Sequence, residues 1–464
     1  MFVRNLLREN DLHRMRLLAD LIDVTMFLVD RIFMKKLAAA WLCLFSASVW
    51  AETTPKNIIF VISDGMGPAY TTGYRYFADD PATKEVEETV FDRLYVGSAS
   101  TYPAPVSGYV TDSAAAATAL SSGVKSYNGA IGVDADKQPV QTLLEKAKAA
   151  GYKTGVAVTS QINHATPAAF LTHNESRRNY NAIADSIFDQ RVNGQFTADV
   201  MLGGGWLYFQ RKDRDIVQQF KDAGYTYVDK IDQLPSVKQG SPLLGLFAEI
   251  GLPWALDYPQ KRRLLPLAEA AVHQLENDKG FVLMIEASQV DWAGHANDVA
   301  AAMVEMADLS DTLEWLEAYV DSHPDTLLVV TADHSTGGLT LARDGEYIWS
   351  PEFIHTLDQS PKTIADELGK IDDAKKRAAS AEKLLKVELT KDEKESLEAI
   401  TAKDDKAFYA WVKHYIDLKT HTGWTTDGHT AVDVPVLAKG VAASKFAGNQ
   451  DNTDLAKKLG SFIQ

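Results

Sequence analysis

The stretch NIIFVISDGMG, residues 57–67, decides the fold of this chain. After Asn57, residues 58–62 are an unbroken apolar run rich in β-branched side chains, which is typical of a strand buried on both faces of a parallel sheet. The run leads directly into Asp64 and a glycine-containing turn. Open α/β sheets bind their ligands just past the carboxyl ends of the strands, so Asp64 is a candidate site residue. Taken alone, such a motif is more typical of an ordinary strand-to-helix turn.

Three later segments have the same apolar, β-branched character. They are TGVAVT at 154–159, FVLMI at 281–285 and TLLVV at 326–330. Helical patterns lie between them, for example at 141–150 and 299–322. This alternation predicts one doubly wound α/β domain, with a mostly parallel central sheet flanked by helices.

Polar residues follow these predicted strands, as Asp64 follows the first. They are His164 and Thr166 in NHATP, Glu286 after the third strand, and Asp333 with His334 in ADHSTGG. Because parallel strands end at one edge of a sheet, we expect these side chains to meet there. Each segment also has an ordinary interpretation, as a helix cap or a glycine turn, and only their conjunction favours a metal site.

A carboxylate and an imidazole follow Glu286 in the segment EASQVDWAGHAND. Asp291 and His295 have i, i+4 spacing, which places both side chains on one face if the segment is helical. The pair is either half of a zinc site or a hydrogen-bonded surface pair. His429, in DGHT near the end of the chain, is either a further nitrogen ligand or part of a simple turn.

The segment TDSAAAATAL, residues 111–120, predicts the start of a buried helix, since small polar residues cap helices and alanine favours them. Ser113 would lie in its first turn, where unpaired N–H groups and the helix dipole stabilise an alkoxide or a phosphate. The alanines would let this helix lie close beneath a crowded site. Ser113 is therefore a candidate nucleophile if the other polar residues converge on it.

The composition restricts the functions open to the chain. It has 464 residues, 46% of them hydrophobic, and a formal charge of −16. Such a charge disfavours a protein that grips nucleic acid, and an anionic substrate would need local positive charge such as metal ions. The single cysteine, Cys43, lies in an expected signal peptide. Metal ligands in the mature chain must then be His, Asp, Glu or Thr.

The first 51 residues are expected to be absent from the mature protein. Met34 and two lysines precede an apolar run at 37–49, and this pattern predicts a signal peptide over 34–51 with cleavage after Ala51. A short buried helix is the alternative for that run. A start codon placed too far upstream would explain residues 1–33. We therefore expect a periplasmic or secreted protein, and no later stretch is long and apolar enough for a membrane span.

The mature chain, residues 52–464, is predicted to be one domain with a helical insertion at about 361–418. The insertion is rich in Lys, Glu, Asp and Ala at helical spacing. Its apolar faces favour a cover over the main domain or a dimer contact, and a solvated surface helix pair is the alternative. We expect a homodimer. The proline-containing residues 234–266 are predicted to be a second excursion from the core.

Six motifs occur in an order that resembles the bacterial alkaline phosphatase family: SDGMG, TDSAAAATAL, NHATPAAFLTHNESR, EASQVDWAGHAND, TADHSTGGL and DGHT. The resemblance covers nearly the whole mature chain and is weak over 234–266 and 345–420. It implies an alkaline phosphatase, an enzyme that hydrolyses phosphate monoesters through a phosphoserine intermediate. It also implies a site with two zinc ions and one magnesium ion.

The resemblance assigns Ser113 as the nucleophile and groups the expected metal ligands into three sets. The zinc ion that activates the serine would be held by Asp64, Asp333 and His334, and Ser113 itself would be a ligand of this ion. The second zinc ion would be held by Asp291, His295 and His429. The magnesium ion would be held by Asp64, Thr166 and Glu286.

Three further residues are expected near the phosphate. Arg177 matches the family arginine whose planar fork grips two phosphate oxygens, and Arg178 is the alternative if the alignment shifts by one residue. His164 stands where an aspartate is often found near the magnesium, and Trp292 stands where a lysine can lie near phosphate. We place both among the substrate-binding residues, and His164 also among the metal ligands. An imidazole tolerates zinc or cobalt better than magnesium, which leaves the third metal open.

Two other functions compete with phosphomonoester hydrolysis. A related metallohydrolase would act on phosphodiesters, sulfates or phosphonates, but the C/S-x-P-x-R pattern of sulfatases is absent around Ser113. A secreted protein that only binds zinc or phosphate would not require a serine at a helix start. The expected partners are therefore small phosphate monoesters, with no specific nucleic-acid binding.

Overall fold

A ten-stranded sheet organises residues 54–464, the part of the chain that this computed structural model describes. In sheet order the strands are β14 (Gly448–Asp451), β2 (Tyr95–Ser100), β13 (Val434–Gly440), β8 (Thr326–Thr331), β1 (Asn57–Ser63), β7 (Phe281–Ala287), β3 (Lys153–Gln161), β4 (Val200–Gly204), β6 (Leu243–Leu246) and β5 (Thr226–Val228). The seven strands from β8 to β5 are parallel to one another. Only β13 in this sheet runs against both strands beside it. The predicted mostly parallel α/β fold is confirmed.

The central strands are buried along their whole length, as their continuous apolar runs predicted. All seven residues of β1 are buried, and β1 lies between β7 and β8. Ile59 pairs in register with Leu283 on one side and with Leu328 on the other. Strands covered on both faces need apolar side chains at every position, which explains the absence of polar alternation here.

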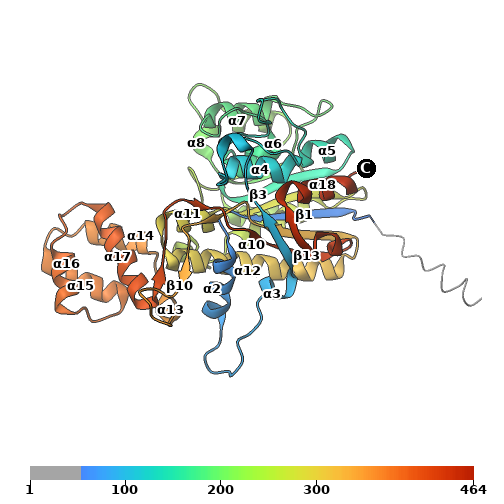
Figure 1. Cartoon of the computed structure of the whole chain (residues 1–464). Helices are drawn as coiled ribbons and strands as arrows, with labels where there is room; N and C mark the ends of the chain where they lie inside the picture. Colours follow the sequence, from blue (N-terminus) through green and yellow to red (C-terminus); the bar gives the residue numbers. More distant parts are fainter. Residues whose placement is uncertain (1–53) are drawn as a thin grey trace, which may run out of the picture. The chain divides into compact units, whose positions relative to one another are not determined.

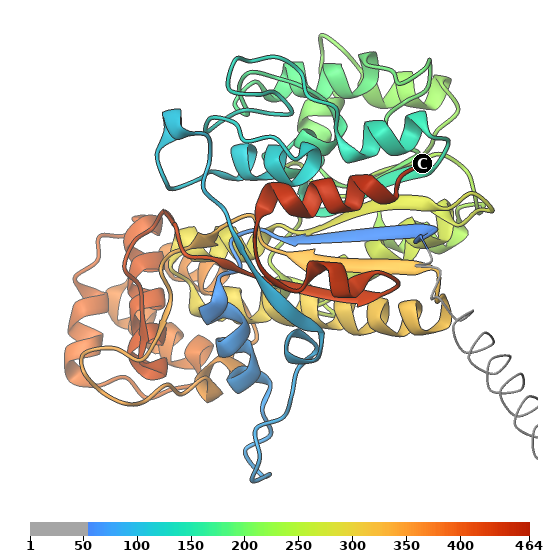
Figure 2. The same cartoon turned by 45° about the vertical axis from the view of Figure 1, so that its right-hand side comes forward.

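Helices cover both faces of the sheet (Figures 1 and 2). One face carries α4 (Ser113–Ser122), α5 (Leu143–Ala149), α6 (Ala165–Leu171) and α18 (Asn452–Phe462). The other carries α2 (Pro68–Ala78), α3 (Val90–Leu94), α10 (Leu264–Leu275) and α12 (Val299–Ser322). Between strands lie α7 (Tyr180–Asp189), α8 (Trp206–Phe209), α9 (Ile216–Asp222), α11 (Gln289–Ala296) and the 3₁₀ helices η1 (Pro105–Ser107), η2 (Ile231–Ser236), η3 (Ala255–Asp257) and η4 (Ala443–Phe446).

Two small antiparallel sheets lie outside the central sheet. One pairs β9 (Ser335–Thr336) with β12 (His429–Thr430), and the other pairs β10 (Thr340–Leu341) with β11 (Thr422–Gly423). Both join the segment after β8 to the segment after the helical insertion. They therefore bring residues near 429 back to the end of β8.

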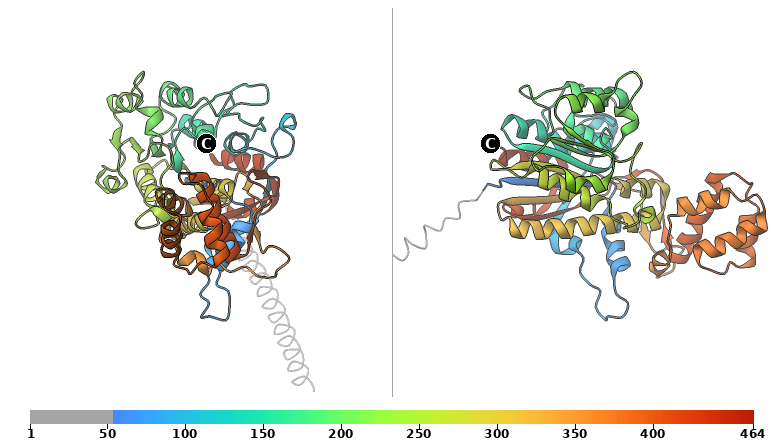
Figure 3. Two further views of the ribbon diagram at one scale, coloured as in Figure 1. Left: turned by 90° about the vertical axis from the view of Figure 1, so that its left-hand side faces the viewer. Right: turned by 180° about the vertical axis from the view of Figure 1, so that it is seen from behind.

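The helical insertion is a group of helices and not a single pair, and Figure 3 shows it from two sides. Its members are α13 (Glu352–His355), α14 (Pro361–Gly369), α15 (Ala374–Leu385), α16 (Lys391–Glu398) and α17 (Asp405–Thr420). They share a small core that includes Leu368, Leu385 and Phe408. The apolar faces seen in the sequence therefore pack largely against one another.

The prediction that residues 234–266 form an excursion was wrong in part. Residues 243–246 form β6, which lies between β4 and β5 in the central sheet, and α10 begins at Leu264. The prolines flank β6 and do not interrupt it. The predicted signal peptide at 34–51 lies outside the described residues. Among residues 54–464, no helix combines the length and the apolar character needed to cross a membrane.

Candidate active site

Carboxylates from three neighbouring strands meet at one edge of the sheet. Asp64 directly follows β1, Glu286 is the penultimate residue of β7, and Asp333 comes two residues after β8. Because β1 pairs in parallel with both β7 and β8, the three side chains arrive at the same edge. All three residues are fully buried. The sequence-based expectation that these residues converge is therefore met.

The first cluster consists of Asp64, Asp333 and His334, whose ligand atoms all lie within 4.8 Å of one another. His334 Nε2 lies 3.1 Å from Asp333 Oδ2 and 3.5 Å from Asp64 Oδ1. The same nitrogen lies 3.1 Å from Ser113 Oγ. The backbone N–H of Gly65 donates to Asp333 Oδ1 at 3.1 Å, so Oδ2 is left for the cluster.

The second cluster consists of Asp291, His334 and His429. His295 stands beside it, with Nε2 3.4 Å from Asp291 Oδ2 and 3.0 Å from His429 Nε2. Asp291 and His295 lie on one face of α11, as their spacing predicted. β12 carries His429 to this place by pairing with β9. His334 belongs to both clusters, which the grouping of ligands by motif did not predict.

The third cluster consists of Asp64, His164 and Glu286. Thr166 lies nearby in the first turn of α6 and is fully buried. Its hydroxyl lowers the pKa of Glu286. The hydroxyls of Ser160 and Ser288 donate to Glu286 Oε2 at 3.1 and 2.6 Å. Oε1 is thereby left without a partner.

Two imidazoles at the site expose the same nitrogen to the second cluster. His295 Nδ1 lies 2.6 Å from the carbonyl oxygen of Asp427, and His429 Nδ1 lies 2.8 Å from that of Thr111. A carbonyl oxygen can only accept a hydrogen bond, so each Nδ1 must be the nitrogen that carries the proton. In the neutral ring, Nε2 then carries a lone pair. Two lone pairs 3.0 Å apart repel each other unless a cation lies between them.

The residues of this edge fit divalent cations. Six buried polar atoms here have no hydrogen-bond partner: both carboxylate oxygens of Asp64, His164 Nδ1, Thr166 Oγ1, Glu286 Oε1 and Asp333 Oδ2. Unpaired buried polar atoms are costly and therefore need a ligand or an ion. Carboxylate, imidazole and hydroxyl groups are the donors that zinc and magnesium take in proteins.

The pKa values of the ionisable groups at the site also favour bound cations. Burial, together with the charges of Asp291 and Asp333, raises the pKa of Asp64 well above its usual value. Burial raises the pKa of Glu286 to about 7. Burial, with help from the positive charge of Arg177, lowers the pKa of His164 to about 3, so its imidazole is neutral and able to act as a ligand. Bound cations would remove the repulsion among these crowded carboxylates.

Ser113 is the first residue of α4 and is almost fully buried. Asp112 caps that helix, since its Oδ1 accepts hydrogen bonds from the backbone N–H groups of Ala115 and Gly129, both at 3.0 Å. Asp112 Oδ2 accepts from Arg177 Nη1 at 3.0 Å. Arg177 Nη2 lies 3.3 Å from His164 Nε2. Arg177 is thus held between the serine and the third cluster, whereas Arg178 is exposed.

Trp292 lies next to His164, with ring centroids 6.0 Å apart and the rings edge to face. Its ring packs against Gly251, where an added Cβ would come within 2.4 Å of it. A glycine is therefore required at 251 if this tryptophan keeps its place.

Several residues at the site were not predicted from the sequence. Thr336 bonds to Asp291 Oδ1 and lies 3.2 Å from His334 Nδ1. Ser160 and Ser288 orient Glu286. Ser288 and Thr336 each lie two residues from a predicted ligand, and this proximity was a usable signal. Ser160 gave no such signal in the sequence, because only the pairing of β3 with β7 brings it close to Glu286.

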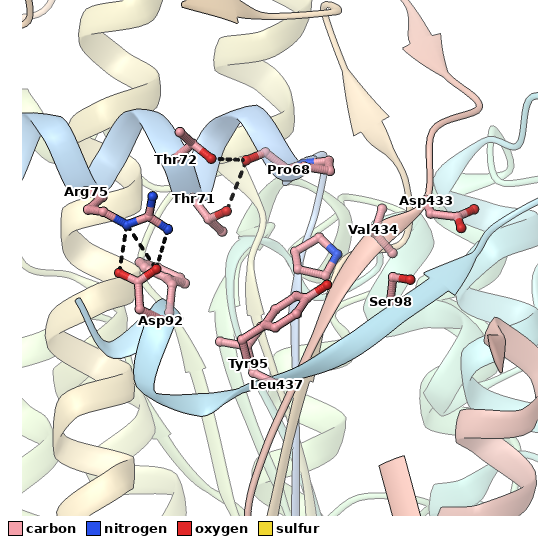
Figure 4. Close-up of a pocket in the computed structure, with 12 residues that line it drawn as sticks. Pro68, Thr71, Thr72, Arg75, Asp92, Tyr95, Ser98, Asp433, Val434 and Leu437 are labelled. Atoms are coloured by element: carbon pink, nitrogen blue, oxygen red, sulfur yellow. Dashed lines mark hydrogen bonds and ion pairs between the residues drawn. The ribbon is translucent and has the colours of Figure 1, made fainter. Parts of the chain in front are cut away.

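A separate hollow of about 420 Å³ lies beside α2, β2 and β13 (Figure 4). Arg75 and Asp92 form a bidentate ion pair in it, and Thr72, Tyr95 and Pro435 are among the residues that line it. None of its lining residues belongs to the three clusters. The hollow is therefore distinct from the candidate active site.

Fold and site together define a class: an α/β protein with a buried, metal-capable centre at the carboxyl edge of a parallel sheet and a serine at a helix start beside it. Comparison with known proteins gives the family. The alkaline phosphatase family profile matches residues 55–464. The chain therefore belongs to the alkaline phosphatase family, and it is a phosphoric monoester hydrolase.

Individual relatives agree with this assignment. Alkaline phosphatase 3 of Bacillus subtilis is 45% identical over 412 residues, which are 88% of this chain and 89% of that protein. The crystal structure of a cold-active alkaline phosphatase from a psychrophilic Shewanella species superposes with a TM-score of 0.83 at 49% identity, covering 88% of this chain and 100% of that one. A histidine-to-glutamate variant of the Antarctic TAB5 alkaline phosphatase, solved with magnesium bound in its M3 site, gives a TM-score of 0.64 at 27% identity, over 89% of this chain and 98% of that one.

Proposed function

We propose that this chain hydrolyses phosphate monoesters through a phosphoserine intermediate on Ser113. The observation that carries the proposal is the position of the Ser113 hydroxyl, 3.1 Å from His334 Nε2. His334 belongs to two metal-capable clusters, so this hydroxyl stands where both converge. A protein that only bound metal or phosphate would need no serine in that place.

The proposed metal complement is two zinc ions and a third divalent ion, which the resemblance to the family gives as magnesium. Asp64, Asp333 and His334 would hold the first zinc ion, and Asp291, His295 and His429 the second. Asp64, Thr166 and Glu286, with His164, would hold the third metal. When bound, the ions would favour ionisation of a serine hydroxyl and of a water molecule, and would neutralise charge on the phosphoryl oxygens.

The chain's own residues carry the two chemical steps. Ser113 Oγ gives up its proton and attacks phosphorus, the bond from phosphorus to the ester oxygen breaks, and that oxygen takes up a proton as the alcohol leaves. A water oxygen then gives up a proton and attacks the phosphoserine, the bond from phosphorus to Oγ breaks, Oγ takes up a proton, and inorganic phosphate departs. The first turn of α4 directs backbone N–H groups and the positive end of its dipole toward Ser113, which favours the anionic oxygen in both steps.

Arg177 would orient the phosphoryl group between these steps. Its planar guanidinium can donate to two phosphate oxygens at once, and Asp112 already fixes one end of the fork. Trp292, beside His164, would line the phosphate site without adding charge. Product phosphate would then be held by one cationic side chain, which favours its release.

His164 leaves open whether the third metal is magnesium. An imidazole beside Asp64 and Glu286 is a better ligand for zinc or cobalt than for magnesium. The TAB5 structure with magnesium was obtained after a histidine had been replaced by glutamate. This agrees with a preference of the histidine-containing site for metals other than magnesium.

We also propose that the mature protein is residues 52–464, periplasmic or secreted after removal of residues 34–51. It would be one catalytic domain with the insertion at about 361–418, and it would form a homodimer. Sedimentation of the purified protein tests the dimer, and the N-terminal sequence of the exported protein tests the cleavage site.

Replacing the nucleophile tests the proposed function. Ser113→Ala should lower kcat/KM on a nitrophenyl phosphate monoester by about a thousandfold or more, because it removes the proposed attacking oxygen beside His334 Nε2. The matched control is Ser122→Ala on the same helix. The Ser122 hydroxyl donates to Thr118 O at 2.6 Å, and this variant should keep full activity.

The same assay separates the competing hydrolase activities. The parent should cleave the monoester faster than the corresponding diester or sulfate. A faster rate on either competitor would contradict the substrate class, and a Ser113→Ala variant as active as the parent would contradict the nucleophile.

A further inference from the structure

His295 and His429 are candidate ligands on short elements outside the central sheet. Asp64 follows a fully buried central strand, whereas His295 lies in the last turn of the eight-residue helix α11. His429 lies in β12, a strand of two residues that follows the loop 424–428. The His295 side chain is 43% exposed. Both histidines therefore depend on contacts from outside the central sheet.

Helix α17 of the insertion holds the end of α11. Lys413 Nζ donates to the carbonyl oxygen of Ala296, the residue after His295. A cation at a helix C-terminus also opposes the negative end of the helix dipole. One turn earlier, the Tyr409 hydroxyl donates to Asp298 Oδ2 at 2.9 Å. Asp298 in turn caps α12 and donates its backbone N–H to Ala293 O at 2.9 Å.

The same helix also holds the loop that leads to His429. Trp424 Nε1 donates to Asp417 Oδ1 at 3.2 Å, and Asp417 is in the last turn of α17. The Trp424 ring packs against Gly337. A Cβ added at Gly337 would lie 2.7 Å from the ring and 2.8 Å from Gly294 O. Gly337 has φ +78°, so glycine is required there for both space and backbone conformation.

The two segments are further tied to each other at their tips. Asn297 Nδ2 donates to Thr426 O at 2.9 Å, and His295 Nδ1 lies 2.6 Å from Asp427 O. A change in either attachment to α17 would therefore move both imidazoles.

We infer that α17 is a positioning element of the active site: Tyr409 and Lys413 fix the end of α11, Asp417 fixes the loop 424–428, and together they set the spacing of His295 and His429. This inference rests on the proposed role of these histidines as ligands of one metal. Outer-shell residues of this kind orient metal-bound imidazoles and commonly change metal affinity by about 10- to 100-fold when altered.

The test measures zinc release, without substrate. The full chain and a Tyr409→Phe/Lys413→Met double variant are loaded with zinc alone, and transfer of zinc to excess chelator is followed by absorbance. We expect one class of bound zinc to leave the double variant about 10- to 100-fold faster than the parent. The remaining zinc should leave at the parental rate, because no hydrogen bond or ion pair among residues 54–464 joins Asp64, Asp333 or His334 to α17.

The same helix supplies a matched control, Tyr415→Phe/Lys419→Met. Lys419 lies over the Tyr415 ring at 4.9 Å, much as Lys413 lies over the Tyr409 ring at 4.4 Å. Lys419 pairs with Glu393 inside the insertion, however, and not with α11. This control should release zinc at the parental rate. Thermal unfolding of the zinc-free proteins reports any general loss of α17 packing, which both double variants would share.

The outcomes separate the inference from the proposed function. Selective loss of one zinc class in the Tyr409/Lys413 variant supports the inference, and the single Tyr409→Phe change should show a smaller effect of the same kind. Equal release rates in variant and parent would overturn the inference alone. A parent chain that takes up no zinc would overturn the proposed function and the inference together.

Discussion

Asp112 shows how one residue can connect the nucleophile to the phosphate-binding side chain. One of its oxygens caps α4, which places Ser113 at the helix start, and the other pairs with Arg177. The capping role followed from the sequence, because Asp is a preferred N-cap. The pairing did not, because a separation of 65 residues carries no information about contact.

Arg177→Lys should weaken phosphate binding while keeping the positive charge. Lysine lacks the planar fork and cannot hold both Asp112 and two phosphate oxygens. Losing one charge-assisted hydrogen bond costs about 1.5–3 kcal/mol, so the inhibition constant for inorganic phosphate should rise about 10- to 140-fold. The measurement is product inhibition of monoester hydrolysis, together with KM.

Arg178→Lys is the control for this change, since Arg178 is adjacent and exposed. It should leave phosphate inhibition unaltered. A larger effect at Arg178 than at Arg177 would mean that the motif is shifted by one residue and that the assignment of the phosphate arginine is wrong.

At the scale of elements, the central strands could be predicted and the edge strands could not. β1, β3, β7 and β8 are covered on both faces, so each appears in the sequence as a continuous apolar run. The edge strand β14 and its neighbour β2, with sequences GNQD and YVGSAS, are partly exposed and have no such run. The reversed direction of β13 depends on the path that the chain takes between α17 and this strand.

Helix α17 carries an unfavourable charge that gives a prediction for stability against pH. Burial raises the pKa of Asp417 to about 7; the hydrogen bond from Trp424 lowers it, and the charge of Asp298 raises it further. The folded state therefore binds this proton more tightly than the unfolded state. Its contribution to the free energy of unfolding falls as pH rises from about 4 to about 7, and the full cost remains above pH 7.

Asp417→Asn should remove this cost, since an amide oxygen can still accept the Trp424 hydrogen bond. The variant should melt several degrees higher than the parent at pH 8, and the difference should shrink to nothing near pH 4. Melting curves at several pH values measure this. Asp372→Asn, at an exposed position of the insertion, is the control and should show no such pH-dependent gain. A constant difference at all pH values would contradict the assigned cause.

At the scale of the whole domain, the sheet converts order along the chain into a cluster in space. Asp64 and His429 are separated by most of the domain, and β1, β8, β9 and β12 bring them to one edge. The sequence predicted which residues would converge because each follows a strand or lies in a recognisable motif. It did not predict that His334 would belong to two clusters, since that depends on side-chain directions after β8.

The residues of α17 that contact the site could not be predicted from the sequence for the same reason. Tyr409, Lys413 and Asp417 lie in a segment whose composition is that of a surface helix, and only the path of the chain places them against α11 and Trp424. The insertion was thus predicted as helices, while its contacts with the site depend on the tertiary fold.

Anomalous diffraction from crystals grown with zinc, measured on both sides of the zinc absorption edge, tests most directly whether divalent cations converge on Ser113. The account predicts two peaks about 4 Å apart, one among Asp64, Asp333 and His334 and one among Asp291, His295 and His429, both beside Ser113 Oγ. Peaks elsewhere in the molecule, or no peak within these clusters, would contradict it.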